Sequence, residues 1–111
     1  MLNLDYLELE SADVGASRAF FAAAFGWRFT DYGPGYTAFD KAGIEGGIAQ
    51  ADGPAHPPLA ILYADDLDAA ERDVVAAGGI VTRPQFDFPG GRRFHFREPG
   101  GNVLAVWSEQ K

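Results

Sequence analysis

Few side chains in this sequence of 111 residues could do acid–base, nucleophilic or metal chemistry. It has no cysteine, which removes disulfides, thiolate nucleophiles and thiolate-bound zinc together. Any metal ion would have to be held by His, Asp and Glu. The candidates that remain for proton transfer or metal binding are His56, His95, Glu8, Glu10 and Glu98.

Glu8 is the best candidate for a catalytic base. It shares strand parity with Tyr6, so its carboxylate should project from the same face, among aromatic side chains. Desolvation there would favour proton uptake, as a general base requires, unless a cation or hydrogen-bond donors compensate. The alternative is a solvated carboxylate paired with Arg93 or Arg28, which is the more usual state of a half-buried acid.

The two histidines lie in less distinctive places. His56 is in a proline-rich segment, and His95 alternates with Phe94 and Phe96, so that it points outward if the two Phe rings line a pocket. A surface or hydrogen-bonded imidazole is more common than a metal ligand in either setting. Neither histidine by itself indicates a metal site.

Composition narrows the classes of partner. Nine basic residues against sixteen acidic ones give a formal net charge of -7, and Arg92-Arg93 is the densest basic run, so nucleic acid is not an expected partner. No apolar run, the one at residues 59–64 included, approaches the roughly 20 residues that span a bilayer, so no membrane partner is expected. With no signal peptide in view, the expected location is the cytoplasm.

The elements that must position these residues occur in two similar series. A strand is predicted over residues 2–10, then a helix that Asp13 caps and Gly26 ends, then short strands over 27–30, 36–40 and 44–50. Residues 51–58 have three prolines and no periodicity, which is typical of a linker. After it come a strand over 59–64, a helix capped at Asp65-Asp66 and ended by Gly78-Gly79, and strands over 80–82, 93–97 and 103–107.

The two series align without gaps over their helices. Asp13 aligns with Asp66 and Gly26 with Gly79, so the offset is 53 positions at both ends of the helix. The pattern predicts an α+β fold of two tandem β-α-β-β-β modules, residues 1–50 and 59–111, that form one domain over residues 1–111 with a shared cleft.

Residues 86–93 offer two interpretations. Two Phe followed by Pro89 and paired glycines would suit a mobile flap over a pocket. The alternative is an ordinary hairpin whose Phe rings anchor it to the core.

Two segments resemble those of a known family. Residues 19–27, Ala-Phe-Phe-Ala-Ala-Ala-Phe-Gly-Trp, look like the FY…FGW segment of the vicinal-oxygen-chelate superfamily, which includes glyoxalase I, bleomycin-resistance proteins and extradiol dioxygenases. Residues 98–102, Glu-Pro-Gly-Gly-Asn, look like its DPxGN turn. Gly46-Gly47-Ile48 and residues 76–79 stand where similar runs occur in the family. The resemblance spans nearly all of the chain and implies one glyoxalase-like domain.

The resemblance also implies where a metal would bind. The positions that match the family's ligands are Tyr6, Leu59 and Ala105, and none of these side chains is a competent ligand for a divalent ion apart from the rarely used phenol. No metal and no cofactor are therefore expected. The loss puts chemistry that depends on a metal, such as that of glyoxalases or dioxygenases, in doubt.

The residues that share strand parity with these three positions are mostly apolar or aromatic, which predicts a cleft of the same character. A small-molecule-binding protein without a metal is predicted, with an apolar or aromatic organic ligand; it is also expected to be a homodimer, because its sheets leave exposed edges. The alternatives are a metal-dependent lyase, isomerase or dioxygenase, and an interaction module that binds no ligand. The residues predicted to contact the ligand are Tyr6, Glu8, Trp27, Phe39, Leu59, Ile61, Phe94, Phe96, Ala105 and Trp107.

Overall fold

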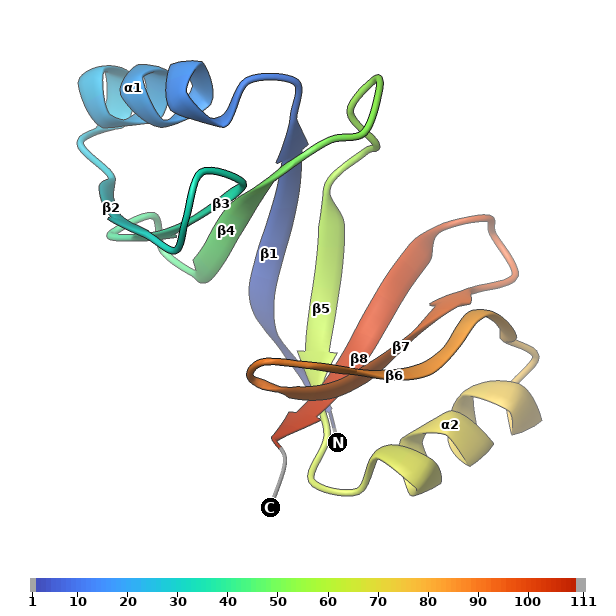
Figure 1. The fold of residues 1–111 in the computed structure, drawn as a ribbon. Helices are drawn as coiled ribbons and strands as arrows, with labels where there is room; N and C mark the ends of the chain where they lie inside the picture. Colours follow the sequence, from blue (N-terminus) through green and yellow to red (C-terminus); the bar gives the residue numbers. More distant parts are fainter. Residues whose placement is uncertain (1, 110–111) are drawn as a thin grey trace. The chain divides into compact units, whose positions relative to one another are not determined.

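A computed structural model describes residues 2–109 and divides them into two compact units. The N-terminal unit is Tyr6–Leu59, and the C-terminal unit comprises residues 60–109 together with residues 2–5. Each half of the chain runs through a strand, a helix and three further strands (Figure 1). The two tandem β-α-β-β-β modules predicted from the repeat are therefore present.

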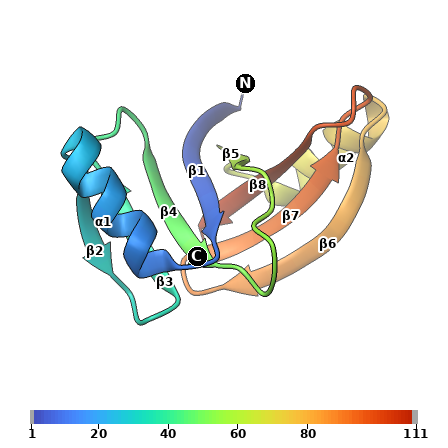
Figure 2. The ribbon, with the colours of Figure 1, turned by 90° about the horizontal axis from the view of Figure 1, so that it is seen from above.

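The first module contains β1 (Asn3–Ser11), α1 (Val14–Phe25), β2 (Arg28–Asp31), β3 (Tyr36–Asp40) and β4 (Glu45–Gln50). Its strands lie in the order β2-β3-β4-β1, with β1 parallel to β4 and the other neighbours antiparallel. The helix α1 covers one face of β2, β3 and β4 (Figure 2). Between helix and sheet lie the buried Val14, Phe39 and Ile48, and around them pack Leu9, Phe21, Trp27 and Phe29.

The second module contains β5 (Leu59–Tyr63), α2 (Leu67–Ala76), β6 (Ile80–Phe88), β7 (Gly91–Arg97) and β8 (Val103–Glu109). Its strands lie in the order β5-β8-β7-β6, with β5 parallel to β8 and the other neighbours antiparallel. The helix α2 packs on β6, β7 and β8. Its core consists of Ala64, Leu67, Ala70, Phe94 and Val106, with Leu62, Val74, Val81 and Phe96 packed against it.

Both helices begin at the caps that the sequence predicts. The Asp13 carboxylate accepts a hydrogen bond from the backbone N–H of Ala16 at 3.0 Å, and the Asp66 carboxylate accepts one from Ala69 at 3.0 Å. Gly26 ends α1 with a φ of 73°, in the left-handed region where glycine is not strained. Both predicted starts and the end of α1 are confirmed because local hydrogen bonding fixes them, whereas α2 ends at Ala76, just before the predicted Gly78-Gly79.

The strand predicted over residues 80–82 was too short. β6 continues to Phe88 and pairs with β7 as a hairpin, so residues 86–93 lie mostly in strands. The register between β6 and β7 shifts twice, between Val81 and Arg83 and between Arg83 and Phe86. These irregularities, with Pro84 in the strand, interrupt the alternation that would have revealed its length.

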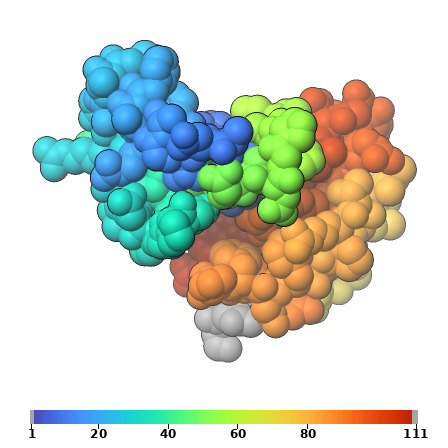
Figure 3. All heavy atoms as spheres, turned by 45° about the horizontal axis from the view of Figure 1, so that its top comes forward, coloured from blue at the N-terminus to red at the C-terminus, as the bar shows by residue number. Residues whose placement is uncertain are grey.

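Part of α1 leaves large apolar side chains at the surface. Phe20 and Phe25 are 59% and 61% exposed, and Figure 3 shows α1 standing at the molecular surface along much of its length. Within residues 2–109, no helix is both long and apolar enough to cross a membrane.

Candidate functional site

The sheet of the C-terminal unit has one face that packs against α2 and one that points away from it, and the two faces carry different side chains. In the β5–β8 ladder Ile61 pairs with Ala105 and Tyr63 pairs with Trp107, and these four residues share the face away from α2. Ile61 and Ala105 are almost fully buried, whereas Tyr63 and Trp107 are half-buried. On this face the side chains of Ile61 and Ala105 are therefore covered, while the two rings stay partly accessible.

Arginines and aromatic rings occupy the rest of the same face. Arg93 and His95 of β7 pair with Trp107 and Ala105 of β8, which places them on this side of the sheet. We define the Arg–aromatic face as this surface; its members are Tyr63, Arg83, Phe86, Phe88, Arg93, His95 and Trp107.

Cation–π and ring contacts order the Arg–aromatic face. The guanidinium of Arg83 lies 3.6 Å from the centroid of the Phe86 ring, and that of Arg93 lies 5.3 Å from the same centroid. The Phe86 and His95 rings are 5.7 Å apart. The Trp107 indole packs edge-to-face against Tyr63 with centroids 4.9 Å apart. Flat apolar surface and positive charge are thus combined on one face.

His95 is held neutral on the Arg–aromatic face. Burial, together with the positive charges of Arg93 and Arg83, lowers the pKa of its imidazole to about 4. Its Nε2 atom is buried and has no hydrogen-bond partner within residues 2–109. Because a neutral imidazole can donate from one ring nitrogen and accept at the other, His95 can hydrogen-bond a ligand without adding charge.

Phe94 and Phe96 were predicted to line the cleft. This prediction was wrong, because it assigned them to the opposite face of β7. Phe94 is fully buried and Phe96 packs beside it, both against the core under α2. His95, which was expected to point outward, lies on the opposite face. Trp27 and Phe39 were also predicted to line the cleft, but their rings lie 4.8 Å apart in the core under α1. These apolar rings gain more by covering the helix side of each sheet than by lining an open face.

In the N-terminal unit Tyr6 and Glu8 lie on the face away from α1. The alternate residue Leu9 packs into the core under α1, so the opposite parity carries Tyr6 and Glu8 away from the helix. The hydroxyl of Tyr6 is hydrogen-bonded to that of Tyr36, a residue of β3 that sequence reasoning did not single out. Leu59 lies half-buried at the start of β5.

Other candidate acids and bases serve the fold. The Glu10 carboxylate accepts a hydrogen bond from the backbone N–H of His56 at 3.1 Å and contacts its Nδ1 at 2.7 Å, which lowers the Glu10 pKa. The Glu98 carboxylate accepts hydrogen bonds from Gly100 and from Asn102, which lower its pKa and close the turn between β7 and β8. These contacts explain Glu10, His56 and Glu98 without a ligand.

The residues at the expected metal positions do not suit a metal ion. Ala105 is a fully buried aliphatic side chain, Leu59 offers no donor atom, and the Tyr6 hydroxyl is engaged with another phenol. Nowhere in the part of the chain that the structure describes do three His, Asp or Glu side chains gather closely enough to bind a metal.

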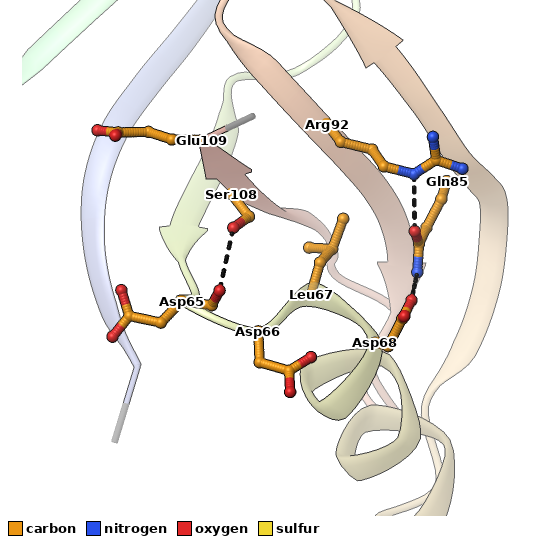
Figure 4. A pocket seen from close by; sticks show the side chains of 8 residues that line it. All are labelled: Asp65, Asp66, Leu67, Asp68, Gln85, Arg92, Ser108 and Glu109. Atoms are coloured by element: carbon orange, nitrogen blue, oxygen red, sulfur yellow. Dashed lines mark hydrogen bonds between the residues drawn. The ribbon is translucent and has the colours of Figure 1, made fainter. Parts of the chain in front are cut away.

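A polar depression lies at the N-terminal end of α2 (Figure 4). Gln85 donates to the Asp68 carboxylate at 2.8 Å and accepts from Arg92 at 2.8 Å, while the Asp66 carboxylate caps the helix. Its polar groups therefore largely satisfy one another, and its excess of carboxylates repels anions. It is lined by Asp65, Asp66, Leu67, Asp68, Gln85, Arg92, Ser108 and Glu109.

The depressed pKa of His95 predicts an acid sensitivity of the fold. Between pH 6.5 and about 4 the unfolded chain binds a proton at this residue and the folded chain does not, so acidification across this window favours unfolding. NMR titration of the His95 ring should give a midpoint at about 4. In urea denaturation, His95→Gln should lose less stability than the unmodified protein when the pH falls from about 7 to about 4.5. A titration midpoint near the ordinary value would contradict this assignment.

Comparisons with known proteins agree on one family. The family model described as "Glyoxalase/Bleomycin resistance protein/Dioxygenase superfamily" matches residues 3–106. Among solved structures, the Mn(II)-bound glyoxalase from Novosphingobium aromaticivorans superposes with a TM-score of 0.70 at 24% identity, over 97% of this chain and 40% of the other.

Two curated relatives extend the comparison. The anthracycline biosynthesis protein DnrV from Streptomyces peucetius is 36% identical in an alignment that covers 92% of this chain and 45% of the relative. The putative glyoxylase CFP32 from Mycobacterium tuberculosis is 28% identical, over 96% of this chain and 46% of the relative. The chain thus spans less than half the length of these relatives. With the family model covering nearly all of it, the chain belongs to the glyoxalase/bleomycin resistance protein/dioxygenase superfamily.

Proposed function

We propose that this protein binds a planar aromatic small molecule that carries a negative charge, without the help of a metal ion, and that the Arg–aromatic face is its binding surface. The observation that carries the proposal is the placement of Arg83 at 3.6 Å and Arg93 at 5.3 Å from the centroid of one ring, that of Phe86. Two cations held at one ring favour a ligand that has both an apolar plane and an anionic group.

The details of the face support this ligand class. Tyr63 and Trp107 supply half-buried ring surface beside the buried Ile61 and Ala105. The Trp107 indole N–H donates to the Asp5 carboxylate at 3.0 Å, which fixes the plane of the ring. A neutral His95 leaves the positive charge of the face to the arginines, so a ligand anion would be drawn toward them.

The names of the relatives are compatible with the proposal. One is named for anthracycline biosynthesis, and anthracyclines are aromatic compounds. Another is named as a putative glyoxylase, which keeps a metal-dependent enzyme as the alternative. That alternative has no support from the side chains at positions 6, 59 and 105.

A matched pair of dyes tests the ligand class. 1-Anilinonaphthalene-8-sulfonate and N-phenyl-1-naphthylamine share an aromatic skeleton and differ in the sulfonate, and both gain fluorescence in an apolar site. We expect the sulfonate to bind more tightly. Arg83→Met should weaken the sulfonate roughly five- to tenfold, about 1 kcal/mol, and leave the neutral dye within twofold. Phe86→Ala should weaken both dyes.

Arg72→Met is the matched control, because Arg72 is an exposed cation on α2 away from this face. It should leave both affinities unchanged. Circular dichroism melts would show that the variants remain folded, since the sulfonate dye also binds partly unfolded chains. If neither dye binds, or if Arg72→Met has the same effect as Arg83→Met, the assignment of the face fails and the interaction module without a ligand is favoured.

Metal independence is tested separately. We expect the purified protein to hold well under one equivalent of zinc, nickel, manganese or iron by elemental analysis, because the aligned positions offer no adequate ligand set. Treatment with EDTA should change neither the dye affinity nor the melting temperature. About one metal ion per chain, removed by EDTA with a drop in melting temperature, would instead favour the enzyme.

We also propose that the protein is a cytoplasmic homodimer. β2 and β6 end the strand order of their units, and α1 exposes Phe20 and Phe25, so the chain has both open strand edges and apolar surface to cover. Light scattering at micromolar concentration should return twice the chain mass of 11.9 kDa. A mass equal to a single chain would rule the dimer out at that concentration.

A further inference from the structure

The two helices of the repeat present different side chains to solvent. At the offset of 53 positions, Phe20 of α1 aligns with Asp73 of α2. The residue before each is Ala19 in α1 and Arg72 in α2, and all four residues are exposed. α2 thus has the charged outer surface that is typical of a helix in contact with water. α1 occupies the same place in its own module, yet its outer surface is apolar.

One face of α1 is apolar along the length of the helix, which stands at the molecular surface (Figure 3). The Phe20 ring is 59% exposed and packs edge-on against the Phe25 ring, which is 61% exposed, with centroids 6.1 Å apart. A helix that is apolar on all sides is usually buried on all sides. We define the α1 apolar face as the exposed residues Ala16, Ala19, Phe20 and Ala23, which recur at helical spacing, together with Phe25.

The charges around this face indicate what covers it. Arg18 is the one charged residue of α1, and its Nε atom lies 3.1 Å from the Asp31 carboxylate, which neutralises it. An anionic membrane would repel a chain of formal charge -7, and helices that bind such membranes have several Lys or Arg beside the apolar stripe. The face therefore fits an uncharged apolar protein surface, and the α1 apolar face of a second copy is such a surface.

The geometry of the α1 apolar face suits pairing with itself. Ala19 and Phe20 lie at the middle of α1. In an antiparallel pair with its two-fold axis at that point, both residues meet their own counterparts, and Ala16 lies opposite the partner's Ala23. The small alanines let the helices approach closely. The exposed rings of the two copies would bury roughly 500 Å², about half of what a specific interface needs, and the alanines and the surface around them add to this area.

We propose that two copies of this chain pair through their α1 apolar faces, with the helices antiparallel and the Phe20 ring of each copy packed on the partner's Phe20. The proposal rests on the homodimer proposed above, and it assigns the interface to α1 instead of the open edges of β2 and β6. The interface belongs to the N-terminal unit and uses no residue of the Arg–aromatic face.

Phe20→Asp tests the interface, because it gives α1 the residue that α2 has at the aligned exposed position. In light scattering and sedimentation at micromolar concentration, the unmodified protein should have the mass of a dimer and Phe20→Asp that of a monomer. The dissociation constant should rise at least about 30-fold. Val75→Asp is the matched control, because Val75 is an apolar residue of α2 that is 55% exposed. It should leave the dimer intact.

A single cysteine gives an independent readout, because the chain has none of its own. The two copies of residue 19 lie beside the two-fold axis, so Ala19→Cys should form a disulfide-linked dimer under mild oxidation. Val75→Cys should stay unlinked. Ala19→Cys also decides the question if Phe20→Asp does not fold, as judged by circular dichroism, since it is a small change at an exposed position.

Three results would overturn the proposal. A folded Phe20→Asp variant that remains a dimer, or an Ala19→Cys dimer that does not link, would reject this interface and leave the proposed homodimer standing. A monomer of the unmodified protein at micromolar concentration would reject both. Binding of that monomer to phosphatidylcholine vesicles, lost in Phe20→Asp, would assign the α1 apolar face to lipid instead of a second copy.

Discussion

Close packing of rings on both faces of β4 is the constraint on which the N-terminal unit depends. A Cβ at Gly46 would collide with the Phe39 ring and with the backbone of β1, and a Cβ at Gly47 would collide with the phenol of Tyr36. Phe39 belongs to the core under α1, while Tyr36 stands on the opposite face. Two consecutive glycines therefore let one strand carry the core on one side and a polar group on the other.

In the C-terminal unit, charged side chains occupy the face of the sheet that lies opposite the core. Its core takes Phe94, and the alternate residues Arg93 and His95 fall on the other face, where Arg93 approaches the ring of Phe86. Burial and the nearby guanidinium groups keep the imidazole neutral. Were His95 protonated, a third positive charge would join Arg83 and Arg93 on a partly desolvated surface. The acid sensitivity of the fold and the charge of the Arg–aromatic face thus have the same origin.

The starts of the helices depend on local sequence and could be predicted. The face of the sheet to which the side chains of β7 point could not. The caps Asp13 and Asp66 and the stop at Gly26 act within one helical turn, so residue types and spacing were sufficient to place both helices. The parity of β7 was assigned wrongly because aromatic residues suit both a ligand face and a core. The requirement that the helix side of each sheet be apolar would have decided it, since only Phe94 and Phe96 of β7 can fill that side.

The partner of Tyr6 could not be found from sequence alone. Tyr36 is 30 positions away and follows an ordinary glycine-rich turn, and its approach depends on the register of three strands. The one sequence signal was Gly47, since a glycine within a short strand often marks a place where something approaches closely.

The substitution of a hydroxyl pair for a metal position changes what the fold can select. A divalent ion attracts any oxygen with lone pairs and binds an anionic oxygen most strongly, so a metal centre favours ligands that ionise when they bind. A pair of phenols such as Tyr6 and Tyr36 brings no positive charge to that position. If a negative ligand binds this protein, its charge should therefore be neutralised by Arg83 and Arg93. The two modules, alike in fold, thus differ in the chemical groups that alternate residues present on the faces away from their helices.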